Sequence, residues 1–359
     1  GVVMTPVVGD LDGDGIGDVA FSAFNVTTFD PTNQRGELML VSGDGSVTEL
    51  WHITEIEHGG TTYYPSSRGN IALGDLDGDG TAEVCAVMHE ADVLCLNYDG
   101  TSTPVVKFVV DNPGDLSDLW NSTTGAPAIA NMLGDSGSDA EGELVWGRIL
   151  YDHTGAIETA SPGGFGSPGG SQGQAYNGQI GHADDDGYLE LLTGTTAWDL
   201  DEEENWYFAA DGAAASADLD GDGVYEVVST FTDPWSSSPD WTTWLGVHIG
   251  IDPTPPATWN VETTLIDNGA WTGGPTIANF DNDPALEVAV SGLTHLQVFD
   301  YDPTDMTMVE LWSMPINDTS SSMLSSSAVD WDHDGKWELL YADEDDLYLI
   351  DVTTGTNLF

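Results

Sequence analysis

The segment Asp10-Leu-Asp12-Gly-Asp14-Gly-Ile-Gly-Asp18 places acids at alternate positions, a glycine at the sixth position and a further acid at the ninth. Closely similar segments begin at Asp75 and Asp218. A short, tightly turned segment rich in carboxylates suits Ca²⁺, which takes about 6–8 oxygen ligands at about 2.3–2.6 Å. The recurrence of the segment also indicates a repeat architecture.

Acidic segments of this kind mark seven positions along the chain. Their intervals range from 36 residues (182 to 218) to 65 residues (10 to 75). Short apolar runs precede and follow each segment, a third run ends in a turn of the Asp-Gly type, and some units have a fourth run. Such runs predict β-strands, and no helical periodicity of useful length is present. The seven segments begin at Asp10, Asp75, Asp135, His182, Asp218, Asn279 and Asp330.

Four antiparallel strands repeated seven times predict an all-β fold, a seven-bladed β-propeller, with the acidic loop between strands 1 and 2 of each blade. The seven units account for residues 1–359 as a single domain. The last unit reaches Phe359 as its fourth strand would begin, so we expect the outer strand of that blade either to be missing or to be supplied by residues outside this sequence. The Gly/Ser/Pro-rich stretch Ser161–Gly178 is predicted to be a loop.

Five of the loops carry the pattern most completely, and we expect about five tightly bound Ca²⁺ ions there. Carboxylates so close together repel one another without a cation, so metal binding and folding should be linked and the role of the ions structural. The predicted ligands are Asp10, Asp12, Asp14 and Asp18 in the first loop; Asp75, Asp77, Asp79 and Glu83 in the second; Asp218, Asp220, Asp222 and Glu226 in the fifth; Asn279, Asp281, Asp283 and Glu287 in the sixth; and Asp330, Asp332, Asp334 and Glu338 in the seventh.

The other two loops depart from the pattern and predict up to two weaker sites. Gly137 stands where the third loop needs its second acid, and His182, a poor Ca²⁺ ligand, begins the fourth. In the sixth loop Pro284 replaces the glycine. The weaker predicted ligands are Asp135, Asp139 and Glu143 in the third loop, and Asp184, Asp186 and Glu190 in the fourth.

With these motifs and their spacing, the whole chain resembles the FG-GAP/VCBS repeat family, which includes the propellers of integrin α-subunits and many microbial surface proteins. The resemblance implies Ca²⁺ loops on one face of the propeller and a protein or glycan ligand on the opposite face. It also implies an extracellular or cell-surface protein, which can be part of a larger surface protein. On this plan the residues of the ligand face include Trp235, Trp241, Tyr63, Tyr64 and Trp271.

Exposed aromatic rings beside Asp and Asn suit stacking on sugars or binding to a protein. The alternative is that tryptophans pack between blades, as we expect of Trp51 and Trp312.

The formal net charge is −57, with only 5 Lys and Arg residues, and five Ca²⁺ ions would return only 5 × 2 = +10. This charge suits salty surroundings or a cationic or Ca²⁺-bridged partner, and a generally acidic secreted protein is the alternative. Nucleic acid and anionic membrane surfaces are disfavoured as partners because their phosphates carry the same charge. No apolar run approaches the roughly 18–20 residues that would insert into a membrane.

The two cysteines, Cys85 and Cys95, fall on adjacent predicted strands joined by a turn at His89–Asp92. Either a cross-strand disulfide or two buried thiols would fit this placement. Neither cysteine has the basic neighbours that would activate a thiol.

Catalytic signals are weak. The 62 acids produce close carboxylate pairs by chance, so a glycosidase pair cannot be inferred, and the 8 histidines show no metal-ligand spacing. We therefore expect a non-enzymatic adhesion or ligand-binding module. The alternatives are a carbohydrate-binding or accessory domain of a polysaccharide-acting enzyme, and an architectural module of a surface filament or layer. Three Asn-x-Thr segments, at Asn25, Asn121 and Asn317, fit the glycosylation pattern, and about that many are expected by accident.

Overall fold

The computed structural model describes the residues 6–23, 35–46, 48–67, 69–89, 92–110, 127–132, 141–146, 149–160, 179–182, 189–192, 196–198, 205–207, 212–232, 243–249, 261–265, 272–281, 283–318, 325–331, 333–343 and 345–358. Contacts along the chain divide it into two compact units, Gly1–Gly178 and Gln179–Phe359.

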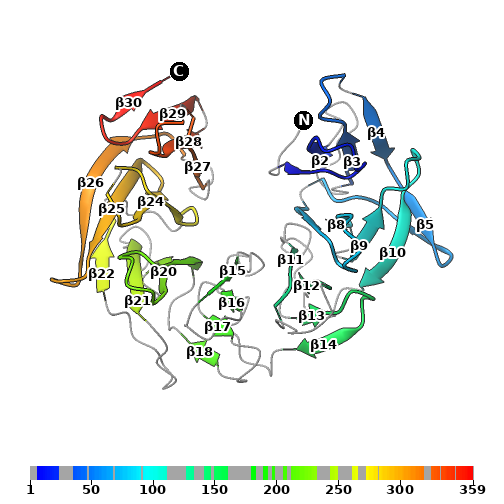
Figure 1. The fold of residues 1–359 in the computed structure, drawn as a ribbon, viewed down its shortest axis with the longest axis horizontal. Coiled ribbons are helices and arrows are strands. Elements are labelled where there is room, and N and C mark those ends of the chain that lie inside the picture. Colours follow the sequence, from blue (N-terminus) through cyan, green and yellow to red (C-terminus); the bar gives the residue numbers. More distant parts are fainter. Residues whose placement is uncertain are drawn as a thin grey trace. The chain divides into compact units, whose positions relative to one another are not determined.

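The described part of the first unit folds into three four-stranded antiparallel sheets and one two-stranded ribbon (Figure 1). In every sheet the strands lie side by side in chain order. The first sheet holds β1 (Val7–Gly9), β2 (Asp18–Ala23), β3 (Glu37–Val41) and β4 (Glu49–Ile53). The second holds β7 (Ile71–Gly74), β8 (Glu83–Val87), β9 (Val93–Asn97) and β10 (Val105–Val110). The third holds β11 (Ala128–Ala130), β12 (Glu143–Trp146), β13 (Ile149–Tyr151) and β14 (Ile157–Ala160).

The described part of the second unit contains four sheets of the same kind. The fourth sheet holds β15 (Gln179–Gly181), β16 (Glu190–Leu192), β17 (Thr196–Trp198) and β18 (Asn205–Tyr207). The fifth holds β19 (Gly212–Ala217), β20 (Glu226–Thr232), β21 (Thr243–Ile249) and β22 (Val261–Thr264). The sixth holds β23 (Thr276–Ala278), β24 (Glu287–Ser291), β25 (His295–Asp302) and β26 (Thr307–Pro315). The seventh holds β27 (Ser327–Val329), β28 (Glu338–Ala342), β29 (Leu347–Asp351) and β30 (Thr356–Asn357).

The predicted all-β class and the four antiparallel strands per unit are confirmed. In each sheet the acidic segment connects the first strand to the second, as predicted. Contrary to the expectation of a missing outer strand, the seventh sheet includes a fourth strand, the two-residue β30, which pairs with β29. In the described residues no helix is long and apolar enough to cross a membrane.

Neighbouring sheets within a unit pack through their faces, because both faces of the middle strands are apolar. All five residues of β8 are buried. Val84 and Ala86 lie in the cluster that joins the first and second sheets. Cys85 and Val87 lie in the cluster that joins the second and third sheets. Alternate residues of a strand point to opposite faces, so one strand serves two cores.

The second unit repeats this packing. One buried cluster joins the fifth and sixth sheets and contains Val288 and Val290. Another joins the sixth and seventh sheets and contains Ala289 and Val298. The first strands of consecutive sheets also contact each other within each unit: β1 with β7, β7 with β11, β15 with β19, β19 with β23, and β23 with β27.

Trp51 confirms the expectation that it packs between sheets. It is buried in the cluster of the first and second sheets, with its ring edge-on to Tyr98 at 5.6 Å between centroids. Its indole Nε1 donates to the carbonyl oxygen of Thr101 at 3.2 Å. Trp312 is partly buried against the cluster of the sixth and seventh sheets.

The ribbon of β5 (Ile56–His58) and β6 (Thr61–Tyr63) was not predicted. Gly59 and Gly60 form its turn with φ of 61° and 87°. Two residues with positive φ fit a two-residue hairpin loop, and Gly-Gly between two short β-prone runs was the signal for it.

Cys85 and Cys95 form a disulfide across β8 and β9, where the two residues are register partners. Of the two alternatives that the sequence left open, the disulfide is therefore the one found. Both cysteines are completely buried.

The disulfide should stabilise the second sheet mainly by restricting the unfolded chain. Its sequence separation is 10 residues, and a loop of that size is worth about 2–3 kcal/mol. We expect the double variant Cys85→Ala/Cys95→Ala to lose about that much unfolding free energy in a denaturant titration. Reduced wild-type protein should lose the same amount, and unchanged stability in both would contradict the expectation.

Candidate metal centres

The acid that closes each acidic loop makes one recurrent contact. This acid is the first residue of the second strand. Its carboxylate accepts a hydrogen bond from the backbone N–H of the loop's second residue. In the described loops the donor and acceptor pairs are Leu11 to Asp18 Oδ2 (3.1 Å), Leu76 to Glu83 Oε2 (2.7 Å), Met132 to Glu143 Oε2 (2.7 Å), Leu219 to Glu226 Oε2 (2.8 Å), Phe280 to Glu287 Oε2 (2.5 Å) and Trp331 to Glu338 Oε2 (2.7 Å).

The reason for this contact lies in the core. The second residue of the loop is apolar and its side chain is buried, as in Leu76, Leu219 and Phe280. Burial takes its backbone N–H out of water, and an unpaired buried N–H is costly. The closing acid accepts that hydrogen bond. Trp331 in the seventh loop is the exception, because its side chain is 59% exposed.

The acid in the first position folds the rest of the loop around itself. Asp75 Oδ2 accepts from the N–H of Gly80 at 2.7 Å, and Asp218 Oδ2 accepts from the N–H of Gly223 at 3.1 Å. These glycines have φ of 88° and 93°, a conformation that side chains rarely adopt. In these two loops the turn therefore favours glycine in the sixth position, as the sequence indicated.

Among the residues that the structure describes, four loops bring three carboxylates together, with one oxygen from each lying within 4.8 Å of the others. The closing acid of each group is buried, so a polar floor lies beneath the more exposed acids of the loop. Such an all-oxygen arrangement can hold a metal ion. The groups are Asp10, Asp12 and Asp18; Asp75, Asp77 and Glu83; Asp218, Asp220 and Glu226; and Asp281, Asp283 and Glu287.

Glu226 and Glu287 show how strongly these sites favour a cation. Burial and, to a lesser degree, the charges of the nearby aspartates together raise the pKa of each carboxyl from 4.5 to about 7. The Oε1 atom of Glu287 is buried and has no hydrogen-bond partner. A bound cation would offset both costs, because it pairs with the buried charge and takes up the free oxygen.

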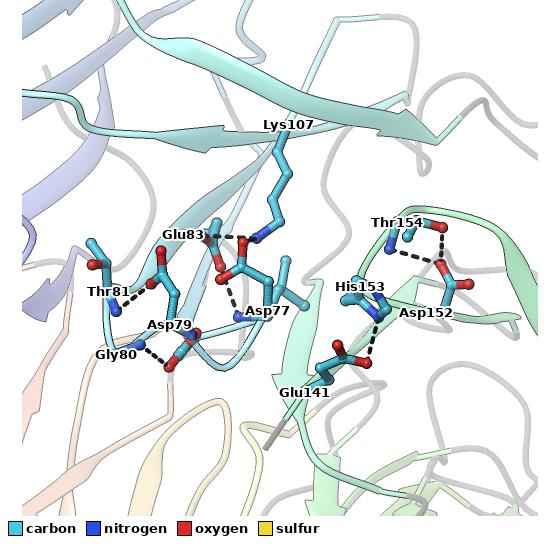
Figure 2. A network of polar contacts seen from close by, with 12 residues as sticks. Asp77, Asp79, Gly80, Thr81, Glu83, Lys107, Glu141, Asp152, His153 and Thr154 are labelled. Atoms are coloured by element: carbon cyan, nitrogen blue, oxygen red, sulfur yellow. Dashed lines mark hydrogen bonds and ion pairs between the residues drawn. The ribbon is translucent and has the colours of Figure 1, made fainter. Parts of the chain in front are cut away.

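The second loop differs from the others because a lysine reaches its carboxylates (Figure 2). Lys107, on β10, lies 3.0 Å from Glu83 Oε1 and also contacts Asp77 Oδ2. The Lys107 ammonium lowers the pKa of Asp77 below its usual value. Burial raises the pKa of Glu83 in spite of this ammonium. No basic residue at this place was predicted from the sequence.

The third loop is longer than the loop predicted from the sequence pattern. The N–H that bonds to Glu143 belongs to Met132, eleven residues earlier, where the other loops have a separation of seven. Asn131 directly follows β11, as Asp10 follows β1, so Asn131 holds the first position. Asp135, which the sequence pattern aligned with that position, lies four residues further along the loop.

Five predicted ligands lie outside the residues that the structure describes: Asp135, Asp139, Asp184, Asp186 and Asp332. Glu190 is buried at the start of β16, in the place of the other closing acids. In the seventh loop Asp330 accepts from the N–H groups of Asp334 (3.1 Å) and Gly335 (3.3 Å), as in the regular loops.

The sixth loop has a neutral first residue and an additional acid. Asn279 donates from its amide to the carbonyl oxygen of Asp283. Asp300 follows Phe299, the register partner of Val288, and so lies beside the closing Glu287. Burial raises the pKa of Asp300, and the charges of Asp283 and Asp281 raise it further. Asp300 therefore faces the same group of carboxylates, a neighbour that the loop sequence alone does not reveal.

The predicted ligand face is described only at Tyr63 and Tyr64, since Trp235, Trp241 and Trp271 lie outside the described residues. The guanidinium of Arg35 lies 3.4 Å from the centre of the Tyr64 ring. This cation–π contact covers one face of the ring. Tyr63 and Tyr64 line a small pocket together with Met88 and His89.

No protein-family model and no curated protein matches the chain. Solved structures do share its fold. The biofilm matrix protein Bap1 of V. cholerae is 14% identical, with a TM-score of 0.71 over 100% of this chain and 80% of that one. The rhamnogalacturonan lyase YesW is 16% identical, with a TM-score of 0.54 over 96% of this chain and 70% of that one. At these identities the likeness concerns the fold alone.

The raised pKa values give the metal-free protein a distinctive pH dependence. A carboxyl whose pKa is higher in the folded state keeps its proton there, so stability falls as pH rises from about 4.5 to about 7. Each glutamate contributes on the order of 3 kcal/mol to that loss. In chelator we therefore expect Tm to rise when pH is lowered from about 7.5 to about 5.5.

The double variant Glu226→Gln/Glu287→Gln should flatten this dependence, whereas Glu158→Gln, an exposed glutamate outside the acidic loops, should leave it unchanged. In excess Ca²⁺ the slope should reverse, because protons then compete with the ion. A metal-free protein that loses stability on mild acidification would contradict the expectation.

Proposed function

We propose that this chain is a Ca²⁺-stabilised, non-catalytic β-propeller of seven blades that serves as an extracellular adhesion or ligand-binding module. The observation that carries the proposal is the recurrence of one acidic loop, with three carboxylates converging on a buried closing acid. Ca²⁺ is the ion of choice because the donors are all oxygens in flexible, partly exposed loops. Mg²⁺ demands a stricter octahedron and retains several waters.

The residues that would hold the ions are the converging carboxylates, with Asp14, Asp222 and Asn279 added from the sequence pattern. In the first loop they are Asp10, Asp12, Asp14 and Asp18; in the fifth, Asp218, Asp220, Asp222 and Glu226; in the sixth, Asp281, Asp283 and Glu287 with Asn279. When bound, Ca²⁺ supplies positive charge and fixes the loop, and the loop in turn fixes the first two strands of its sheet. The role we infer is therefore structural.

Three features support the arrangement of the sheets as propeller blades. Each described sheet runs in simple chain order, neighbouring sheets within a unit pack face to face, and their first strands are in contact. Such contacts are expected where inner strands converge on an axis. The family resemblance to FG-GAP/VCBS repeats belongs to the same proposal.

An extracellular location is supported by the disulfide, which persists in oxidising compartments. The fold likeness to a biofilm matrix protein agrees with it. The large negative charge suits a protein that meets salt and Ca²⁺ outside the cell.

The second candidate is a carbohydrate-binding or accessory domain of a polysaccharide-acting enzyme, and the fold likeness to a rhamnogalacturonan lyase favours it. An architectural module of a surface filament or layer is the third. Lyase or hydrolase activity of the purified chain on an acidic polysaccharide would favour the second over the adhesion module.

Chelation tests the calcium part of the proposal. Ca²⁺ at about 1,000 times its Kd stabilises the folded state by about 4 kcal/mol for each site. We therefore expect chelator to lower Tm by about 10 °C or more and added Ca²⁺ to restore it. The variant Asp218→Asn/Asp220→Asn should show a smaller difference between its Tm in Ca²⁺ and its Tm in chelator. The control Asp305→Asn, at the exposed β25–β26 turn, should behave as wild type. The same Tm in chelator and in Ca²⁺ would end the proposal.

The ligand face is tested through Trp235 and Trp241, two of its predicted residues. We expect Trp235→Ala and Trp241→Ala to weaken binding to any glycan or protein that wild type captures on an array, by about tenfold or more. Tm should be unchanged in both variants. Binding that survives both substitutions would remove these residues from the proposed face.

A further inference from the structure

Lys107 occupies an unusual place in the second sheet. Register pairs Val106 with Leu96 and Phe108 with Cys95, so Lys107 is the extra residue of a β-bulge in β10. A bulge redirects the side chain of the extra residue. The fourth strands β4 and β26 have the same irregularity, and there the extra residues are Leu50 and Leu311. A bulge at this place therefore occurs in several sheets, and in the second sheet the extra residue is a lysine.

The redirected side chain ends among the carboxylates of the second acidic loop. Figure 2 shows the Lys107 ammonium between Asp77 and Glu83, with dashed contacts to both. Asp77 and Glu83 are two of the three acids whose oxygens converge in this loop. The Lys107 side chain is 14% exposed and that of Glu83 is completely buried, so this is an interior ion pair.

The location is notable because cations are scarce in this chain. Its sequence contains two lysines, Lys107 and Lys336, against 62 acids. A buried carboxylate needs a partner charge, and removing one member of a buried pair is strongly destabilising. Lys107 supplies the partner charge for Glu83. In the first, fifth and sixth loops a bound ion would supply the partner charge for the closing acid.

We propose that the second acidic loop is closed by the Lys107 ammonium instead of a divalent cation, so that it keeps its fold without metal and binds Ca²⁺ much more weakly than the first, fifth and sixth loops. The ammonium and an ion would compete for the same two carboxylates, Asp77 and Glu83. An ion could enter only if Lys107 withdrew, and the displaced ammonium would then face a dication of like charge. The inference rests on the proposed function, because it assumes that the other loops bind Ca²⁺.

The alternative arrangement has Lys107 beside a bound ion as an outer partner of its ligands. In that case removing the lysine would leave the number of bound ions unchanged or lower it. The two arrangements therefore predict opposite changes in the stoichiometry of the same variant.

Native mass spectrometry of the whole chain, titrated with Ca²⁺ alone, separates them. We expect Lys107→Met, which keeps the apolar stem, to hold one more tightly bound Ca²⁺ than wild type. Lys107→Arg keeps the cation and should match wild type. Arg35→Met, which removes a positive charge outside the acidic loops, is the matched control and should also match wild type.

Stability gives an independent reading of the same variant. In chelator the Tm of Lys107→Met should fall below that of wild type by about 5 °C or more, because Glu83 loses its counter-charge. Added Ca²⁺ should recover most of that loss by entering the vacated position. A loss that Ca²⁺ does not recover, together with an unchanged ion count, overturns the inference.

Hydrogen exchange on wild type tests the inference without any variant. The N–H groups of Leu76 and Gly80 bond to Glu83 and Asp75 in the second loop, and those of Leu219 and Gly223 bond to Glu226 and Asp218 in the fifth. On removal of Ca²⁺ we expect faster exchange in peptides covering 218–226 and unchanged exchange in peptides covering 75–83. Equal acceleration in both loops overturns the inference.

The two proposals fail in distinguishable ways. If wild type binds Ca²⁺ and Lys107→Met binds the same number of ions, the inference alone is overturned. If wild type and every variant bind no Ca²⁺, the proposed function fails and the inference falls with it.

Discussion

The hydrogen bond from the second residue of each acidic loop to the acid that closes it is the contact on which the rest of the architecture depends. It allows an apolar side chain such as Leu76 or Leu219 to enter the core between sheets while its backbone N–H remains satisfied. The same contact fixes a carboxylate at the floor of the loop. In Glu287 the second carboxylate oxygen, Oε1, is buried without a hydrogen-bond partner, and a cation is the natural partner for that oxygen.

This arrangement ties packing to charge. The sheets need the loop residue for their core, the loop needs the closing acid, and the acid is buried at the cost of a raised pKa in Glu226 and Glu287. The chain can meet that cost in two ways. A divalent ion can enter the loop, as we propose for the first, fifth and sixth, or an internal ammonium can do so, as Lys107 does in the second.

Local pattern was sufficient to predict the all-β class, the four strands per unit and the place of each acidic loop, because these follow from apolar runs and turn residues close in sequence. Local pattern could not predict contacts between residues that are distant in the sequence. Lys107 reaches Glu83 from two strands away through a bulge, and Asp300 reaches the sixth loop from β25. The third loop was misaligned because Asn131 lacks the acid that marks the first position elsewhere, and the Gly-Gly turn of the β5–β6 ribbon was overlooked.

The central claim is that converging carboxylates in these loops bind divalent cations. A crystal structure of the protein grown in Ca²⁺, with anomalous scattering to identify the ions, tests it most directly. We predict ions coordinated by Asp10, Asp12 and Asp18, by Asp218, Asp220 and Glu226, and by Asp281, Asp283 and Glu287 at about 2.3–2.6 Å. Carboxylates surrounded only by water in all three loops would contradict the account.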